Sequence, residues 1–272
     1  MKKHLLSIIR YFQQTKQKMK WRAEYKSLLQ GASFQQLKPE LDDNNKYLII
    51  LPHSDDEWIG CSTIISNPIF QTLICNADMP GGDSIEIHCK RKKEIERLAK
   101  KYNREVVTLS EEKPKELAHL IITYNPDCVF VPYWFDWHPE HIQVIDILKS
   151  CLDLCREVSF EIGMYQVTVP ICLDNITHKL KMNKDQWNLK WSEFRLNYKT
   201  QRHFPWYRVA LNELLQGRSQ SLFACEVFTV LGKSLWEEKY YSSKATEIMQ
   251  HELKQSLNSL LDIRKIKQPI IF

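Results

Sequence analysis

The chain has 272 residues, of which 43% are hydrophobic and 26% are charged, and its formal net charge is +5. A chain of this length and composition is typical of a soluble globular protein, and it can bury a core without disulfides or a structural metal. Nucleic-acid-binding proteins usually concentrate more positive charge on one face, so we expect no nucleic-acid partner.

Residues 1–45 are predicted to form a helical extension. The apolar stretch at residues 5–9 is too short for the core of a signal peptide, and no later stretch approaches the roughly 20 apolar residues of a membrane span. In a helix, one side gathers apolar residues, namely Leu5, Leu6, Ile8, Ile9 and Phe12. We expect this side to pack on the protein itself or on a partner subunit, and peripheral contact with an anionic membrane surface is the alternative.

From residue 46 onward, short β-rich runs alternate with helical patterns. The predicted strands span residues 47–51, 71–76, 105–109, 127–132, 160–169 and 226–231. The predicted helices span residues 57–66, 85–102, 115–124, 139–155, 192–201, 206–215 and 243–267. Continuous apolar strands separated by helices predict a mostly parallel sheet with helices on both faces. We therefore expect an α/β, Rossmann-like, doubly wound domain at residues 46–235 and a helical tail at residues 236–272 that serves packing or dimerisation.

The eight cysteines contain no C-x-x-C pair, and most of them lie in apolar runs. A free cysteine in such a run behaves as a small hydrophobic residue. Unpaired thiols indicate a reducing compartment, so we expect a cytoplasmic protein. If the N-terminal helix binds lipid, the protein is expected at the inner membrane surface.

Two polar clusters directly follow the first and fourth predicted strands. The first is HSDDE at residues 53–57, and the second is YWFDWHPEH at residues 133–141. In a doubly wound sheet these two strands are neighbours and ligands bind at their carboxyl ends, so the clusters are expected to face each other. Capping of helix N-termini explains one or two of the carboxylates, but it does not explain the histidines beside them.

Histidine and carboxylate without thiolate are ligands that suit zinc and also accept iron(II), cobalt or manganese. Three protein ligands with one open position are typical of a catalytic zinc site, where bound water becomes a nucleophile near neutral pH. We therefore predict one catalytic divalent ion per chain, and we expect it to be Zn²⁺.

The segments HSDDE at 53–57 and HPEH at 138–141 resemble the two zinc loops of the PIG-L/LmbE-like de-N-acetylases. RKKE at 91–94, YKTQ at 198–201 and EVF at 226–228 resemble further motifs of that family, so the resemblance runs from about residue 47 to residue 231. The family acts on N-acetylglucosaminyl compounds, including phosphatidylinositol glycans, thiol-cofactor precursors and antibiotic sugars. The resemblance implies a zinc-dependent N-deacetylase whose substrate is a small or lipid-linked amino sugar, with a role in cell-surface glycan synthesis.

Carried over residue by residue, the resemblance implies that His53, Asp56 and His141 bind the zinc ion. Asp55 is then the general base for the attacking water. His138 either stabilises the tetrahedral oxyanion or protonates the leaving amine.

Residues around the two loops are candidates for the second shell and for substrate binding. Glu140, where the family has aspartate, is expected to orient the catalytic histidine, and Ser54 replaces a family proline without removing a ligand. Trp137 is expected either to stack on a sugar ring or to belong to the core. Asp83 can bind sugar hydroxyls or serve as a turn residue. Arg91 can meet an anionic group of the aglycone or be a solvated helix residue.

Two other functions remain open from the sequence. One is a catalytically silent glycan-binding module on the same fold, and the other is a zinc amidohydrolase that acts on a different amide or on a nucleotide sugar. Retention of all the expected ligands and of the expected base favours the deacetylase. The oligomeric state is left open, with a homo-oligomer as one alternative.

Overall fold

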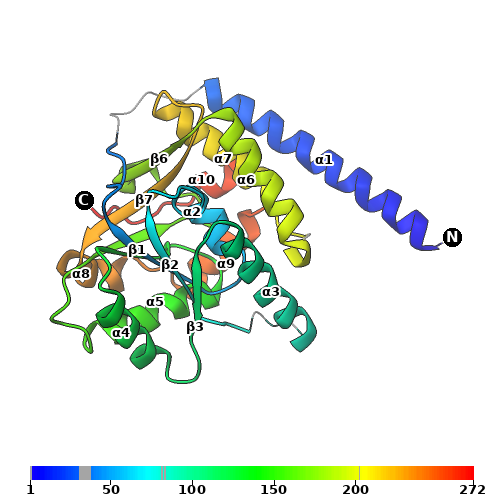
Figure 1. The fold of residues 1–272 in the computed structure, drawn as a ribbon. Helices are drawn as coiled ribbons and strands as arrows, with labels where there is room; N and C mark the ends of the chain where they lie inside the picture. The colour runs from blue at the N-terminus through cyan, green and yellow to red at the C-terminus, as the bar shows by residue number, and fades with distance from the viewer. Residues whose placement is uncertain (1, 31–37, 81, 83, 202) are drawn as a thin grey trace.

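A computed structural model of the chain describes residues 2–30, 38–80, 82, 84–201 and 203–272, with side chains from residue 12 onward (Figure 1). The strands are β1 (Lys46–Leu51), β2 (Gln71–Asn76), β3 (Glu105–Thr108), β4 (Cys128–Pro132), β5 (Glu161–Tyr165), β6 (His178–Met182) and β7 (Ala224–Gly232). The helices are α1 (Lys2–Gln30), α2 (Asp56–Ser66), α3 (Ile85–Lys101), α4 (Lys113–Tyr124), α5 (Pro139–Leu152), α6 (Lys184–Asn197), α7 (Trp206–Ser219), α8 (Lys233–Ser243), α9 (Glu247–Ser256) and α10 (Leu260–Lys265). Two short 3₁₀ helices are η1 (Leu173–Asn175) and η2 (Lys199–Gln201).

The seven strands form one sheet in the order β3-β2-β1-β4-β5-β7-β6. The pairs within β3-β2-β1-β4-β5 are parallel, whereas β7 runs antiparallel to both β5 and β6. This confirms the predicted Rossmann-like, mostly parallel α/β fold. After β1 the chain adds β2 and β3 on one side of β1, and it then adds β4 on the opposite side of β1. The order of the strands therefore reverses between β1 and β4, and this is the switch point where ligands are expected to bind.

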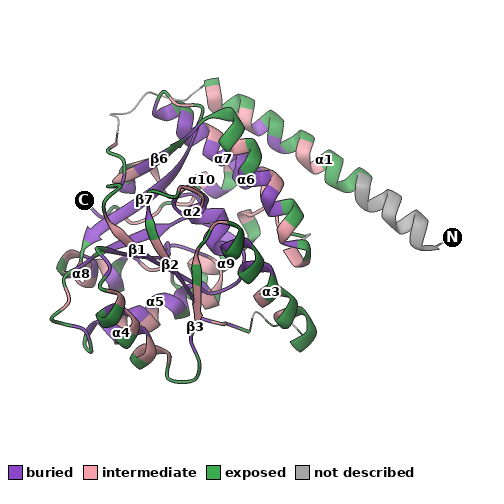
Figure 2. Ribbon diagram, viewed as in Figure 1, coloured by how far each residue is buried: buried purple, intermediate pink, exposed green. Residues whose placement is uncertain are grey.

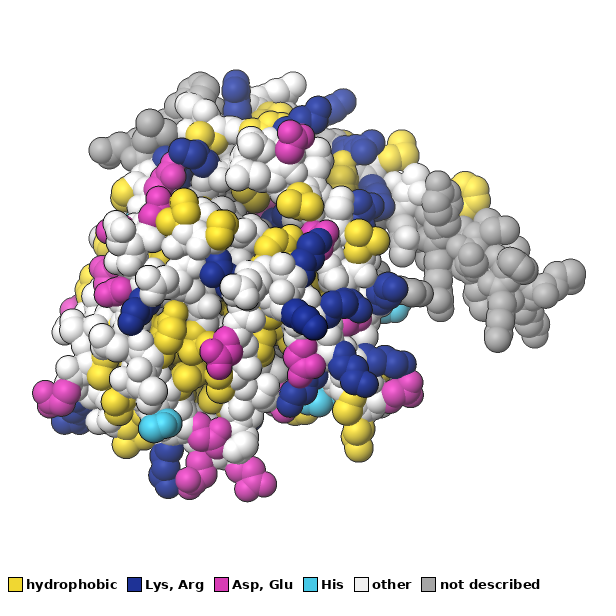
Figure 3. Space-filling view, viewed as in Figure 1, with side chains coloured by type: hydrophobic (Ala, Val, Ile, Leu, Met, Phe, Trp, Pro, Cys, Tyr) yellow, Lys and Arg dark blue, Asp and Glu magenta, His cyan; other side chains and the backbone are white. Residues whose placement is uncertain are grey.

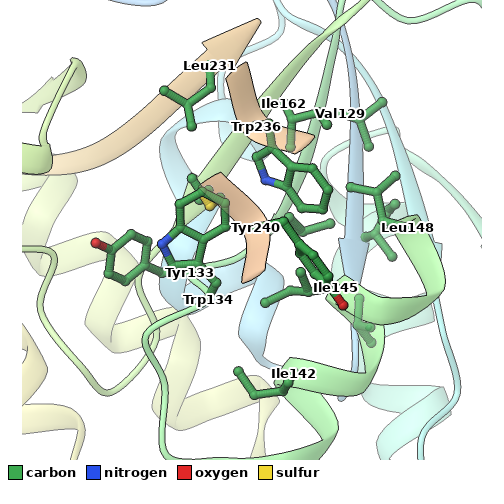
Figure 4. Close-up of a cluster of buried hydrophobic side chains, with 14 of the residues drawn as sticks. Val129, Tyr133, Trp134, Ile142, Ile145, Leu148, Ile162, Leu231, Trp236 and Tyr240 are labelled. Carbon is green, nitrogen blue, oxygen red and sulfur yellow. The ribbon is translucent and has the colours of Figure 1, made fainter. Parts of the chain in front are cut away.

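Both faces of the sheet are covered, and Figure 2 shows its strands mostly buried. Successive side chains of a strand point to opposite faces, so Leu48 and Ile50 of β1 belong to one core cluster and Ile49 and Leu51 to the other. Figure 4 shows part of the first cluster, where Trp236 of α8 lies near side chains of α5 and of the sheet. These two cores fix the sheet between its helices and thereby fix the strand ends that carry the polar loops.

The structure differs from the sequence prediction in the last third of the chain. Strand β6 was not predicted, because two lysines interrupt the apolar pattern of its sequence HKLKM. It pairs with β7 at the edge of the sheet, and its Lys179 also forms an isolated bridge with Glu40. Helix α6 begins eight residues before the predicted start at residue 192, where Asn183 and Gln186 form a reciprocal capping box. The single tail helix predicted at residues 243–267 is wrong, because Thr246 and Ser259 each cap a new helix, α9 and α10.

The C-terminal half of α1 packs on the body of the protein. Trp21 is buried against Leu211 of α7 and Leu260 of α10, and its indole N–H donates to the carbonyl of Asn258 at 3.0 Å. The carboxylate of Glu24 accepts from the backbone N–H of Leu260 at 2.8 Å. Packing on the protein itself therefore holds for this half. On the predicted apolar side only Phe12 is described, and it is exposed. The side chains of residues 5–9 lie outside the described part of the chain. Among the described residues, no helix is sufficiently long and apolar to cross a membrane.

Candidate active site

The first polar loop leaves the carboxyl end of β1 and turns sharply into α2. Asp55 adopts a φ of 143°, a backbone region that favours glycine, and its N–H donates to the carboxylate of Glu57 at 2.9 Å. Asp56 then begins the helix. A residue held in such a conformation costs free energy and is common at functional sites, so the turn is a structural reason to regard Asp55 as functional.

The second polar loop leaves the carboxyl end of β4, the neighbour of β1 in the sheet. The carboxylate of Asp136 accepts from the backbone N–H of His138 at 3.0 Å. The His138 ring caps α5, since its Nδ1 accepts from the N–H of Glu140 at 3.3 Å, and Pro139 occupies the first helical position. His141 follows in the first turn of α5, so both loops place their histidines at one edge of the sheet.

His53 and His141 both direct a ring nitrogen at one oxygen of Asp56. Nδ1 of His53 lies 3.3 Å from Oδ2 of Asp56, and Nε2 of His141 lies 3.4 Å from the same oxygen. Two ligand atoms about 2.0–2.1 Å from a tetrahedral zinc ion are about 3.3 Å apart. All three side chains are buried. The predicted ligand residues therefore lie together, and these spacings fit a zinc ion.

The other nitrogen of each of these histidines faces a second carboxylate. Nε2 of His53 lies 2.5 Å from Glu140 Oε2, and Nδ1 of His141 lies 3.2 Å from Asp136 Oδ2. Such carboxylates place the ring proton on the outer nitrogen and leave the inner lone pair for a metal. Glu140 thus contacts His53, whereas its expected partner was His138. Asp136 was not among the predicted site residues, although its place in the second polar cluster was a signal.

His138 lies beside the two other histidines, and suitable ring atoms of His53, His138 and His141 all lie within 4.8 Å of one another. A set of three histidines is therefore a second candidate ligand set. Burial, reinforced by the charges of His141 and His53, lowers the pKa of His138 to about 4. Because its Nδ1 accepts a hydrogen bond, the neutral ring carries its proton on Nε2.

The adjacent carboxyl groups Asp55 and Asp56 have opposite pKa shifts. Burial, with the charges of Asp56 and Glu57, raises the pKa of Asp55 well above its ordinary value. Burial alone would also raise the pKa of Asp56, but His141 and His53 bring it below the ordinary value. Two carboxyl groups whose pKa values are shifted in opposite directions are suited to different chemical roles. One can act as a proton acceptor and the other as a permanent anion.

The motifs RKKE and YKTQ meet next to Asp55. The carboxylate of Glu94 accepts from the backbone N–H and the hydroxyl of Thr200, at 3.2 and 2.6 Å. This contact fixes η2, from which the amide of Gln201 donates to Asp55 Oδ1 at 3.3 Å. The hydroxyl of Tyr198 donates to Glu57. Gln201 was not among the predicted site residues, and its place in a motif resembling that of the family was the available signal.

The three histidines, the two adjacent aspartates and Gln201 line one cavity of about 180 Å³. Its lining residues are His53, Asp55, Asp56, Arg91, Trp137, His138, His141, Val167, Thr168, Gln201 and Phe204. The cavity is smaller than the roughly 300–1,000 Å³ of pockets for drug-sized ligands, so it has room for only a small chemical group.

Two of the three predicted substrate-binding residues lie at this cavity. The indole N–H of Trp137 donates to Thr168 Oγ1 at 2.7 Å, which fixes one wall. Arg91 is half-buried and belongs to α3, where Figure 3 shows lysine and arginine side chains gathered on the surface. Asp83 lies outside the described residues.

Solved structures share the fold of this chain. A conserved protein of Thermus thermophilus is 19% identical with a TM-score of 0.52, covering 68% of this chain and 94% of its own. The N,N'-diacetylchitobiose deacetylase of Pyrococcus horikoshii is 18% identical with a TM-score of 0.53, covering 71% and 85%. A deacetylase triple mutant of the teicoplanin biosynthetic pathway is 11% identical with a TM-score of 0.50, covering 69% and 98%. No protein-family model matches the sequence. At these identities the comparison establishes the Rossmann-like fold of the chain.

Proposed function

We propose that the protein is a zinc-dependent hydrolase that removes the acetyl group from an N-acetylated amino sugar of the N-acetylglucosamine type. The observation that carries the proposal is the arrangement of His53 and His141, whose inner nitrogens converge on Asp56 while their outer nitrogens face carboxylates. Asp55 stands beside this arrangement in the same cavity. Two of the structural neighbours are themselves deacetylases, one of diacetylchitobiose and one from teicoplanin biosynthesis, which favours the same activity here.

Each residue has a distinct role in the proposed reaction. His53, Asp56 and His141 would hold the zinc ion, which when bound would polarise the amide carbonyl and activate water. Asp55, whose pKa is raised, accepts the proton of the attacking water and returns it to the amine nitrogen as the C–N bond breaks, so that acetate and the free amine leave. Neutral His138 donates from Nε2 to the oxyanion that develops on the carbonyl oxygen.

The substrate is proposed to place its acetylated sugar in the cavity and its aglycone outside. Trp137 offers an aromatic face, and Arg91 offers a positive charge for a phosphate or carboxylate next to the sugar. Lipid-linked and nucleotide-linked sugars both carry such a group, so the aglycone is the open part of the proposal.

Acetate release decides whether the proposal holds. Purified protein with one equivalent of Zn²⁺ is incubated in parallel with free, nucleotide-linked and lipid-linked N-acetylglucosamine compounds. We expect release from at least one of them, abolished by a chelator and slowed by about 10²–10⁴-fold in Asp55→Asn. Zinc binding without acetate release from any compound would instead support a glycan-binding module or a hydrolase of another amide.

A further inference from the structure

Helix α2, which begins with Asp56, is broken one turn after its start. Cys61 adopts φ −134° and ψ 25°, which are not helical angles. The preceding residue, Gly60, lies against Tyr165 of β5 so closely that a Cβ atom at this position would overlap the ring. The turn that carries the candidate catalytic carboxylates is therefore separated from the rest of the helix by a kink.

A buried ion pair occupies the hydrogen-bond position that the kink opens. In a regular α-helix the N–H of Thr63 would donate to the carbonyl of Ile59, four residues earlier. Here the N–H of Thr63 donates to Glu226 Oε2 at 3.0 Å. The carbonyl of Ile59 accepts from Lys190 Nζ at 2.6 Å, and Lys190 Nζ also lies 2.6 Å from Glu226 Oε1. The Lys190–Glu226 pair thus bridges the two ends of the missing helical bond.

Further contacts tie this bridge to its surroundings. Glu213 of α7 accepts from Lys190 at 2.5 Å and from the indole N–H of Trp191 at 2.8 Å. The backbone carbonyl of Lys190 accepts from the indole N–H of Trp58 at 2.8 Å, so Lys190 holds the first turn of α2 at two points. Lys190, Glu213 and Glu226 are each 2% exposed or less, so water does not compete for their bonds.

The first turn of α2 needs this external support. A single helical turn is unstable alone, because its nucleation fixes several residues for one hydrogen bond. The N–H groups of Trp58 and Ile59 donate to the carbonyl of Asp55, at 3.1 and 2.9 Å, and so close the turn at its start. Loss of the bridge would therefore loosen the turn on which Asp55 and Asp56 are placed.

We propose that Lys190 and Glu226 are positioning residues for the metal and base carboxylates, because their ion pair replaces the backbone hydrogen bond that α2 loses at its kink. This inference deepens the proposed function, since the turn it fixes carries Asp55 and Asp56. It assigns a role to Glu226, whose EVF segment the proposed reaction does not otherwise use.

The test is a charge-neutral triple variant, Lys190→Met/Glu213→Gln/Glu226→Gln, which leaves no unpaired charge in the interior. We expect backbone amides at residues 58 and 59 to exchange hydrogen at least tenfold faster than in the wild-type protein. We also expect the dissociation constant for Zn²⁺, measured by chelator competition, to rise by about 10–100-fold. If the triple variant does not fold, the single variant Glu226→Gln is read in the same two assays, with smaller changes expected in the same directions.

Arg104→Met is the matched control. The guanidinium of Arg104 donates to the carbonyls of Ile65, Asn67 and Phe70, near the other end of α2. This variant should lower the free energy of unfolding while exchange at residues 58–59 and zinc affinity stay within about twofold of wild type. Unchanged exchange at these residues in both bridge variants would overturn the proposal. If the wild-type protein bound no Zn²⁺, the proposed function would fail, whereas the exchange data would still decide the role of the bridge.

Discussion

Asp136→Asn exchanges one oxygen for a nitrogen at the outer contact of His141. In the wild-type protein, Asp136 Oδ1 accepts from the N–H of His138 at 3.0 Å, and Oδ2 lies 3.2 Å from Nδ1 of His141. The asparagine keeps the oxygen for His138 and directs an NH₂ group at His141. Because two donors then face each other, His141 moves its proton to Nε2, which is the nitrogen that faces Asp56.

The variant should therefore weaken zinc binding while the fold is retained. Loss of an outer hydrogen-bond partner of a metal ligand typically costs about 10–100-fold in affinity, or about 1.4–2.7 kcal/mol. Here the upper half of that range is expected, because the change also blocks the coordinating nitrogen. The dissociation constant is measured by competition with a chromophoric chelator, and the folded state is checked by urea unfolding.

Asp146→Asn is the control, because it makes the same chemical change on α5, the helix that carries His141. Asp146 forms an ion pair with Lys244 at 3.0 Å and does not line the cavity. This variant should bind Zn²⁺ with wild-type affinity. An Asp136→Asn protein that binds Zn²⁺ as tightly as the control would refute the argument that the outer carboxylate sets the proton position of His141.

Three further predictions follow from the same geometry. Asp55→Asn should retain Zn²⁺ but lose about 10²–10⁴-fold in kcat, whereas Asp56→Ala should lose the metal itself. Measuring metal content and acetate release for both variants checks this prediction. If Asp55→Asn loses the metal and Asp56→Ala keeps it, the two roles are exchanged. Arg91→Ala should raise KM for the true substrate more than it lowers kcat, and an unchanged KM would make Arg91 a solvated helix residue. Gly60→Ala should lower the free energy of unfolding by about 1–3 kcal/mol in urea titrations, because its Cβ meets Tyr165; a neutral effect would contradict the described packing.

The parallel half of the sheet could be predicted because its strands are short apolar runs between clear helical patterns. The adjacency of β1 and β4 followed from the rules of doubly wound sheets, and this adjacency brings His53 and His141 together. The antiparallel edge was less predictable. Lys179 and Lys181 interrupt the apolar pattern of β6, whose strand conformation rests on its pairing with β7 and on a bridge to Glu40.

The contacts around the site could not be predicted in the same way. The sequence places Glu140 two residues after His138, yet its carboxylate contacts His53, which belongs to another loop. Likewise, the Lys190–Glu226 bridge joins residues of α6 and β7 to a kink in α2. Such contacts depend on side-chain directions across packed elements, and a spacing rule along the chain contains no information about them.

The charges at the site favour the proposed divalent ion. Five carboxyl groups lie in or around the two loops, namely Asp55, Asp56, Glu57, Asp136 and Glu140. Burial raises the pKa of Glu57 to about 7, and burial together with the charges of Asp56 and Glu57 raises that of Asp55, so these neighbouring carboxyl groups disfavour one another's ionised form. Burial alone would lower the pKa of His141, but Asp136 and Asp56 raise it well above its ordinary value. A proton on His141 therefore supplies one positive charge between these carboxylates. A zinc ion at the same position would displace that proton and supply two charges, which a site with this surplus of carboxylates can accommodate.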